Sequence, residues 1–283
     1  FKDYIFQDCD DSKVLSEAIN FVNLYIVIYK IIVYNIFTEL KMIRLLATDL
    51  DGTLFYPKRI FSGISKKNKY FLKKFTENGN KLVLVSGRNI NVCKRISKKI
   101  KAPVSMIGCN GSVIYKDNEF FCDQPMNTEV VRKFYEKNKY ADNIAAWVFM
   151  SDRYPLVLVP VRLNFFTRMG VLFYMRTQFF YRDKLSYGEK KLYKLFNDDK
   201  ARIYKMMPVY GVGKKKIEVA RKEYDKFLDA YSTEFEILWS RESIEFMKKG
   251  VNKANALKNF IDVLKINSDE VAVAGDSGND IPL

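Results

Sequence analysis

From residue 42 onward, short apolar segments alternate with amphipathic helical segments, and this alternation restricts the fold more than any other feature. Near-continuous apolar runs are typical of strands buried on both faces, and helices between such strands predict a parallel sheet. The expected strands are Ile43–Thr48, Lys81–Val85, Val104–Cys109 and Val271–Gly275, and the expected helices are Ser65–Gly79, Asn89–Ile100 and Asn252–Lys265. The alternation predicts an α/β fold with a Rossmann-like parallel sheet covered by helices on both faces.

The middle of the chain has a different texture, which predicts an insertion into this sheet domain. Helices are expected at 127–138 and 215–231, and strands at 145–151, 201–207 and 234–240. This mixture is typical of an α+β unit. The segment Tyr154–Tyr181 is unusually apolar, and its sequence pattern does not assign it to an element. The expected domains are core residues 42–116, an α+β insertion at 117–244, and core residues 245–283.

Residues 1–41 do not share the pattern of the core. The stretch 18–37 is apolar and aromatic but is interrupted by Lys30 and three asparagines, which makes it a poor membrane-spanning helix. Because Met42 stands directly before the first strand, we expect residues 1–41 to be an atypical apolar leader outside the fold. A cytoplasmic location is expected. A membrane-anchored or organellar location is the alternative if residues 1–41 are a genuine leader, with residues 18–37 as the only possible membrane anchor.

The residue types present limit the chemistry. The 283-residue chain contains no histidine, which excludes a Ser-His-Asp triad and any histidine-ligated metal. Its four cysteines form no CxxC pair and are expected to be reduced thiols. Catalysis must therefore use carboxylates, lysine, hydroxyl groups, thiols or a hard cation held by oxygen atoms.

The net charge of +15 is concentrated between Lys58 and Lys101, where the sequence contains 14 basic residues and one acidic residue. A basic patch can bind nucleic acid. In the helix expected at Asn89–Ile100, however, apolar residues occupy one face and lysines the other. This pattern favours a solvated helix face on an α/β core, so nucleic acid is not the expected partner.

Polar residues follow the carboxyl end of each expected core strand. The four motifs are TDLDGTL at 48–54, SGR at 86–88, NGS at 110–112 and GDSGND at 275–280. Open α/β sheets bind ligands beyond these strand ends. We therefore expect Asp49, Asp51, Asp276 and Asp280 to converge there, where Mg²⁺ would make the clustered carboxylates tolerable.

These side chains suit phosphoryl transfer. An ionised Asp49 can attack phosphorus, and Asp51 can protonate the leaving oxygen and later deprotonate water. The hydroxyl of Ser86 can bind a phosphate oxygen, and Lys253 supplies positive charge at a helix N-terminus behind Asn252.

With these motifs the chain resembles the haloacid dehalogenase (HAD) superfamily, specifically its Cof-type phosphatases. The matching stretches are LLATDLDGTL, LVLVSGR, CNGSVIY, GVNKANAL and VAVAGDSGND, and the resemblance covers Met42–Leu283. It implies a HAD fold in which the insertion is an α/β cap and in which the C-terminal part of the core is missing after Leu283.

The resemblance also implies a role for each site residue. Asp49 would be the nucleophile and Asp51 the acid/base, while Asp49, the Asp51 backbone and Asp276 would ligate Mg²⁺. The full expected site contains catalytic Asp49 and Asp51; phosphate-binding Thr53, Ser86, Gly87, Lys253 and Asn279; Arg88 and Asn110 near the substrate; and Asp49, Asp51, Asp276 and Asp280 around the metal.

The function expected is Mg²⁺-dependent hydrolysis of a small phosphorylated metabolite through an aspartyl-phosphate. Sugar phosphates and nucleotide or cofactor phosphates both remain open as substrates. A phosphomutase of the same superfamily and a non-enzymatic basic nucleic-acid-binding protein remain as alternatives. The sequence predicts no oligomeric state.

Overall fold

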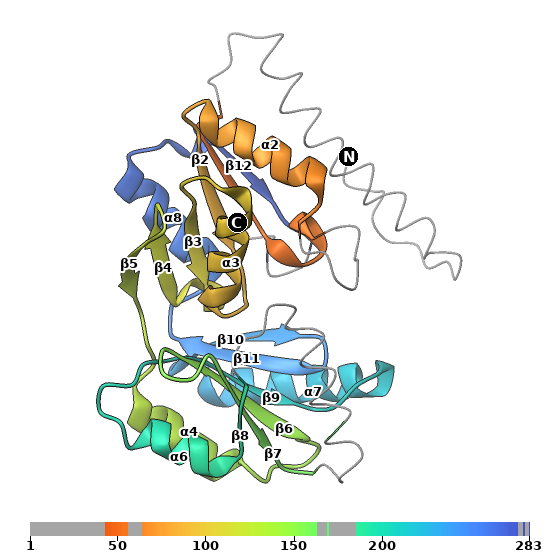
Figure 1. The fold of residues 1–283 in the computed structure, drawn as a ribbon. Helices are drawn as coiled ribbons and strands as arrows, with labels where there is room; N and C mark the ends of the chain where they lie inside the picture. Colours follow the sequence, from red (N-terminus) through yellow and green to blue (C-terminus); the bar gives the residue numbers. More distant parts are fainter. Residues whose placement is uncertain (1–42, 56–63, 163–168, 170–184, 277–279, 281–282) are drawn as a thin grey trace.

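The computed structural model describes residues 43–55, 64–162, 169, 185–276, 280 and 283. Within these residues the chain forms two six-stranded sheets, drawn one above the other in Figure 1. The chain passes from the first sheet to the second between β5 (Glu119–Asp123) and α4 (Thr128–Asn138). It returns between β11 (Ser243–Lys248) and α8 (Lys253–Leu264).

The first sheet has the strand order β12-β1-β2-β3-β4-β5. Its remaining strands are β12 (Val271–Ala274), β1 (Leu45–Thr48), β2 (Lys81–Val85), β3 (Ser105–Gly108) and β4 (Val113–Lys116). The strands β12, β1, β2 and β3 pair in parallel, as the sequence pattern predicted. The hairpin of β4 and β5 is antiparallel, so the sheet is mixed rather than fully parallel.

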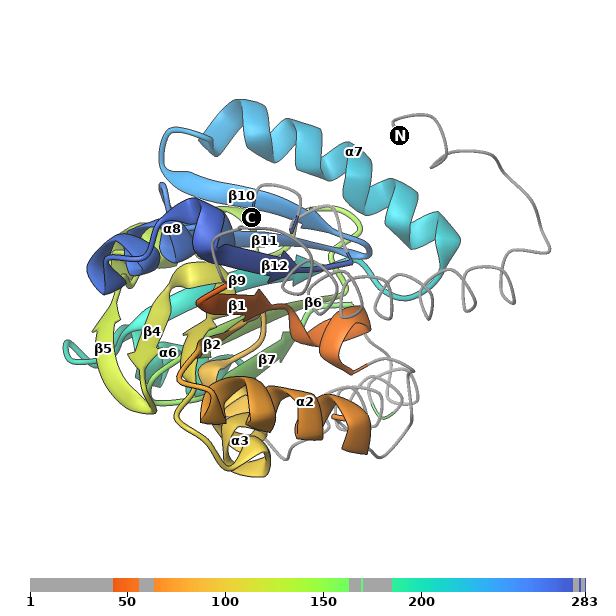
Figure 2. The ribbon, with the colours of Figure 1, turned by 90° about the horizontal axis from the view of Figure 1, so that it is seen from above.

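Helices cover both faces of the first sheet (Figure 2). The helices α2 (Lys66–Glu77) and α3 (Ile90–Ile100) pack on one face, and α8 packs on the other. Strand residues alternate between these faces, so that Leu46 and Leu84 face α2 and α3 while Leu45 and Val83 face α8. The expected helical face of α3 is confirmed, since its apolar residues are buried while Lys98 and Lys99 are exposed.

The second sheet has the strand order β10-β11-β9-β6-β7-β8. Its other strands are β6 (Ala146–Ser151), β7 (Leu156–Pro160), β8 (Leu185–Tyr187), β9 (Ile203–Val209) and β10 (Phe235–Ser240). The helices α4, α6 (Glu189–Phe196) and α7 (Lys214–Tyr231) pack against one face of this sheet around Trp147, Phe149 and Phe246. The other face carries Val148 and Met150 and joins the apolar cluster of the first sheet.

The pairing of the strands places the limits of the insertion differently from the expected residues 117 and 244. The strand β5 belongs to the first sheet because it pairs with β4 across a turn in which Asp117 and Asn118 both have positive φ. The strand β11 belongs to the second sheet because it pairs with both β10 and β9. The second sheet and its helices therefore lie between residues 128 and 248.

Some expectations fall on other parts of the chain. The leader at 1–41 lies outside the described residues, as does Cys9. Among the described residues, Cys93, Cys109 and Cys122 form no disulfide bond. Of the unassigned segment Tyr154–Tyr181, residues 156–160 form β7, and most of the remainder is not described. Among the described residues, no helix has the length and apolar character needed to cross a membrane.

Candidate active site

Asp49, directly after β1, lies in a buried group of charged side chains. Its carboxylate oxygen Oδ1 accepts a hydrogen bond of 2.8 Å from the Nζ of Lys253, and the same Nζ donates to Asp280 Oδ1 at 2.6 Å. All three residues are at most 7% exposed. Lys253 reaches this position because it is the first residue of α8, whose N-terminus is capped by the side chain of Asn252.

Asp276, beyond the end of β12, lies beside Asp49 and Asp280, and these three carboxylates form what we call the acidic group. Carboxylate oxygens of Asp49, Asp276 and Asp280 all lie within 4.8 Å of one another. Thr53 donates its hydroxyl to Asp276 Oδ1 at 3.2 Å. Gly52, with φ of +79°, allows this close approach, because a Cβ at that residue would stand 1.8 Å from Asp276 Oδ2.

Burial and neighbouring charges act in opposite directions on the ionisable groups of this site. Desolvation by burial raises the pKa of Asp49 to about 7, even though the Lys253 ammonium acts in the opposite direction. For Lys253, burial disfavours the charged amine, but Asp49 and Asp280 together outweigh this effect and raise its pKa. The Lys253 ammonium thus pairs with two of the three clustered carboxylates, and a divalent cation beside them would favour their ionised forms.

The acidic group suits Mg²⁺ in its chemistry, since hard oxygen donors are the ligands that this ion takes. The three carboxylate oxygens lie within 4.8 Å of one another, so one cation could be held between them. Because Mg²⁺ usually keeps several of its waters, direct ligation by Asp49 and Asp276 with Asp280 held by Lys253 is compatible with this spacing.

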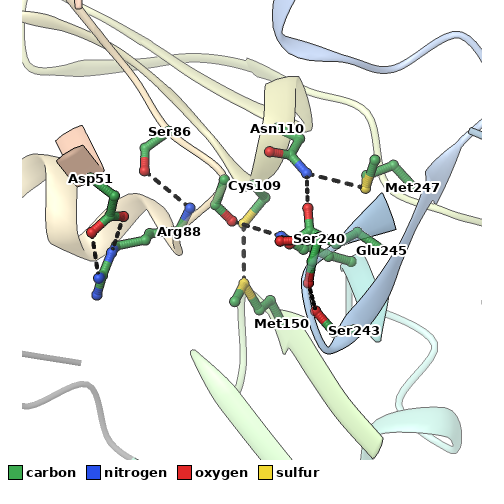
Figure 3. A network of polar contacts seen from close by, with 12 residues as sticks. Asp51, Ser86, Arg88, Cys109, Asn110, Met150, Ser240, Ser243, Glu245 and Met247 are labelled. Atoms are coloured by element: carbon green, nitrogen blue, oxygen red, sulfur yellow. Dashed lines mark hydrogen bonds and ion pairs between the residues drawn. The ribbon is translucent and has the colours of Figure 1, made fainter. Parts of the chain in front are cut away.

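The side chain of Asp51 does not join the acidic group, contrary to the expected convergence of four aspartates. Its carboxylate is held by the guanidinium of Arg88, with distances of 2.5 Å from Nε and 2.6 Å from Nη2 (Figure 3). The reason is local, because the chain leaves extended geometry at Gly52 and the Asp51 side chain remains half exposed.

The ends of β2 and β3 bring Ser86, Gly87 and Asn110 together. The Ser86 carbonyl accepts the backbone N–H of Asn110 at 3.1 Å, and the Ser86 hydroxyl oxygen accepts the N–H of Arg88 at 3.1 Å. Ser86 and Asn110 are both buried. Asn279, the other residue expected near the phosphate, lies outside the described residues.

Two charged residues that the motif analysis missed lie opposite these strand ends. Lys205 on β9 and Glu245 on β11 form a buried ion pair of 2.7 Å. Glu245 also accepts a hydrogen bond of 2.5 Å from Asn110 (Figure 3). The signal in the sequence was a charged residue inside each of two otherwise largely apolar strands, which is unusual for a buried position.

The chain thus has acidic and hydroxyl side chains at the strand ends of an α/β sheet, and a second, inserted sheet faces them. This combination is compatible with a hydrolase. The family described as haloacid dehalogenase-like hydrolase matches residues 46–283, and the chain belongs to this family. Solved structures agree on the fold. A haloacid dehalogenase-like hydrolase from Bacteroides thetaiotaomicron has a TM-score of 0.66 and 20% identity, covering 84% of this chain and 83% of its own. One from B. subtilis has a TM-score of 0.64 and 19% identity, covering 84% of each chain.

Curated relatives include proteins named "Putative phosphatase". The one from Buchnera aphidicola subsp. Schizaphis graminum (strain Sg) is 26% identical over 242 residues, which are 84% of this chain and 80% of the relative. The one from Buchnera aphidicola subsp. Baizongia pistaciae (strain Bp) is 33% identical over 99 residues, 34% of this chain. The chain therefore covers only 35% of the length of the Baizongia pistaciae relative. It covers 54% of the length of a further relative, from Buchnera aphidicola subsp. Acyrthosiphon pisum (strain APS).

Proposed function

We propose that the protein is a Mg²⁺-dependent phosphatase that hydrolyses small phosphomonoesters through an aspartyl-phosphate on Asp49. The observation that carries this proposal is the buried Asp49 carboxylate, held 2.8 Å from Lys253 at the carboxyl edge of the first sheet. Membership of the haloacid dehalogenase-like hydrolases and the names of the curated relatives support the same class of reaction.

In the proposed reaction, an oxygen of the ionised Asp49 bonds to phosphorus while the bond from phosphorus to the alcohol oxygen breaks. Lys253 and the Ser86 hydroxyl bind the phosphoryl oxygens, whose charge is delocalised in the transition state. For this step Asp51, half exposed, leaves Arg88 and takes up a proton, which it gives to the leaving alkoxide. The same carboxylate then takes a proton from the water that hydrolyses the aspartyl-phosphate.

Asp49, Asp276 and the Asp51 backbone would hold the metal, with Asp280 fixed beside them by Lys253. The ion would supply positive charge that keeps Asp49 ionised and offsets the charge of the phosphoryl group. The raised pKa of Asp49 supports this proposal, because burial would otherwise leave the nucleophile partly protonated near neutral pH.

The second sheet would act as a cap that encloses the alcohol part of the substrate. It already contacts the strand ends, since Asn89 donates to the Pro155 carbonyl at 3.1 Å and Asn110 donates to Glu245. Sugar phosphates and nucleotide or cofactor phosphates are the proposed substrates. One relative of 26% identity over 106 residues, from Bacillus subtilis (strain 168), is named a 5-amino-6-(5-phospho-D-ribitylamino)uracil phosphatase.

The proposal is tested by hydrolysis of p-nitrophenyl phosphate with Mg²⁺, with excess EDTA, and by the Asp49→Asn variant. Turnover should require Mg²⁺ and should fall to background in Asp49→Asn, which keeps the shape of the side chain but removes the nucleophile. Beryllium fluoride with Mg²⁺ should stabilise the wild type against heat but not the variant. Full activity in EDTA, or a variant that keeps most of the rate, would remove this mechanism.

A further inference from the structure

Lys205 and Glu245 form a buried ion pair whose presence is not explained by a gain in stability. Lys205 is 2% exposed, and its neighbours along β9 are apolar. A buried ion pair often contributes no more stability than well-packed apolar residues of similar volume, because both charges lose their hydration. The pair therefore invites a functional explanation.

The pair lies in the second sheet and makes hydrogen bonds to residues at the strand ends of the first sheet. The Nζ of Lys205 donates to the backbone carbonyl of Gly87 at 3.0 Å and also pairs with Glu245. Glu245 in turn accepts the side-chain amide of Asn110 at 2.5 Å (Figure 3). Two residues of the second sheet thus hold the ends of both β2 and β3, where the phosphate-binding segment begins.

The contact with Gly87 reaches Ser86 through a single peptide unit. The Gly87 carbonyl and the Arg88 N–H belong to the same planar group and point in opposite directions. Lys205 binds the carbonyl, and the N–H donates to the Ser86 hydroxyl oxygen at 3.1 Å. Because that oxygen accepts the N–H, its hydroxyl hydrogen is directed away and can be donated to a phosphate oxygen.

The packing around Gly87 makes this arrangement sensitive to position. A Cβ at Gly87 would stand 2.6 Å from Asn110 Oδ1 and 3.6 Å from Lys205 Nζ. The Asn110 side chain therefore approaches Gly87 more closely than a Cβ would allow, whereas Lys205 Nζ lies at an ordinary contact distance. The Arg88 side chain that follows holds Asp51, so the same segment positions the proposed acid/base as well.

We propose that Lys205 is a positioning residue, which from the second sheet fixes the Gly87–Arg88 peptide so that Ser86 is set to bind phosphate. The proposal rests on the phosphatase function proposed above. It means that the phosphate site is complete only when the second sheet is seated on the first, and it assigns Lys205 to the phosphate group rather than to the alcohol.

The test is the variant Lys205→Met, which keeps the length of the side chain but removes the donor. With Mg²⁺ present, its affinity for inorganic phosphate should fall about tenfold, as expected for the loss of a hydrogen bond to a charged group. Its kcat/KM should fall by a similar factor for p-nitrophenyl phosphate, glycerol 3-phosphate and glucose 6-phosphate. A loss confined to one of these esters would overturn the proposal, because Lys205 would then recognise the alcohol.

A second variant separates positioning from folding. Lys205→Met leaves Glu245 buried and unpaired, so Lys205→Met combined with Glu245→Gln removes both charges and keeps an acceptor for Asn110. This double variant should fold and still bind phosphate about tenfold more weakly. Wild-type affinity for phosphate in the folded double variant would overturn the proposal.

The matched control is Lys139→Met, which removes a lysine paired with Glu136 and Glu189 on the helix-covered side of the second sheet. This variant should bind phosphate as the wild type does. Calorimetry reports phosphate binding without turnover, so the two proposals can fail separately. Wild-type protein that binds phosphate but hydrolyses none of the esters would contradict the phosphatase function, whereas turnover with an unaffected double variant would contradict only the role of Lys205.

Discussion

The charge of the Asp49 carboxylate depends strongly on its surroundings. It is 4% exposed, it shares the Lys253 ammonium with Asp280, and burial raises its pKa to about 7. In the unfolded chain its pKa would be near the ordinary value of 3.8. The folded metal-free protein therefore holds the Asp49 proton more tightly than the unfolded chain does, which links folding to pH.

This difference predicts how the stability of the metal-free protein changes with pH. The stabilising contribution of protonated Asp49 is complete below pH 3.8 and is lost as the pH rises through about 7. Between pH 5 and 7 the free energy of unfolding in EDTA should fall by up to about 2 kcal/mol more in the wild type than in Asp49→Asn. Urea unfolding at each pH measures it, and parallel curves for the two proteins would contradict the assigned pKa.

At the scale of single elements, capping residues decide where the functional helices begin. Asn252 accepts the N–H of Asn255 at 2.8 Å and so starts α8 at Lys253. Its side-chain amide also donates to Glu236 Oε1 of β10 at 3.0 Å, which ties α8 to the second sheet. Ser65 caps α2 in the same manner by accepting the N–H of Asn68, but its helix supplies no predicted site residue.

The two caps allow a matched comparison. Asn252→Ala and Ser65→Ala should each lower the free energy of unfolding by about 1 kcal/mol, the usual value of an N-cap. Only Asn252→Ala should also lower kcat/KM for a phosphate ester, by several-fold, because the cap that it removes fixes the start of α8, where Lys253 lies. Thermal unfolding and steady-state kinetics of both variants measure this difference. An equal loss of activity in the two variants would mean that the cap does not position Lys253.

The same scale shows what the sequence could predict. The core strands, α2, α3, α8 and the polar strand ends were predictable because periodicity and caps are local signals. The hairpin of β4 and β5 and the membership of β11 were missed, because strand pairing depends on contacts between distant residues. The Asp51–Arg88 pair and the position of Lys205 opposite Gly87 were missed for the same reason, since each joins residues of different strands or sheets.

At the scale of the whole molecule, the two sheets share one apolar cluster. Val148, Met150 and Leu156 of the second sheet belong to the same buried cluster as Val92 of α3 and Cys109, which follows β3. Cys109 Sγ and Met150 Sδ lie 4.0 Å apart across the boundary. An insertion that was only tethered at its two ends would not be expected to share buried apolar surface in this way. The described residues therefore favour unfolding of both sheets in one step.

That expectation can be measured with one probe on each sheet. Trp147 is fully buried in the second sheet, and Cys93 of α3 is fully buried against the first. In a Trp239→Phe background, which removes the more exposed of the two tryptophans, fluorescence reports the environment of Trp147. Alkylation of Cys93, followed by mass spectrometry, reports the first sheet. Because the apolar cluster joins the sheets, both probes should give the same midpoint in urea, and a clearly lower midpoint for Trp147 would show that the second sheet unfolds independently.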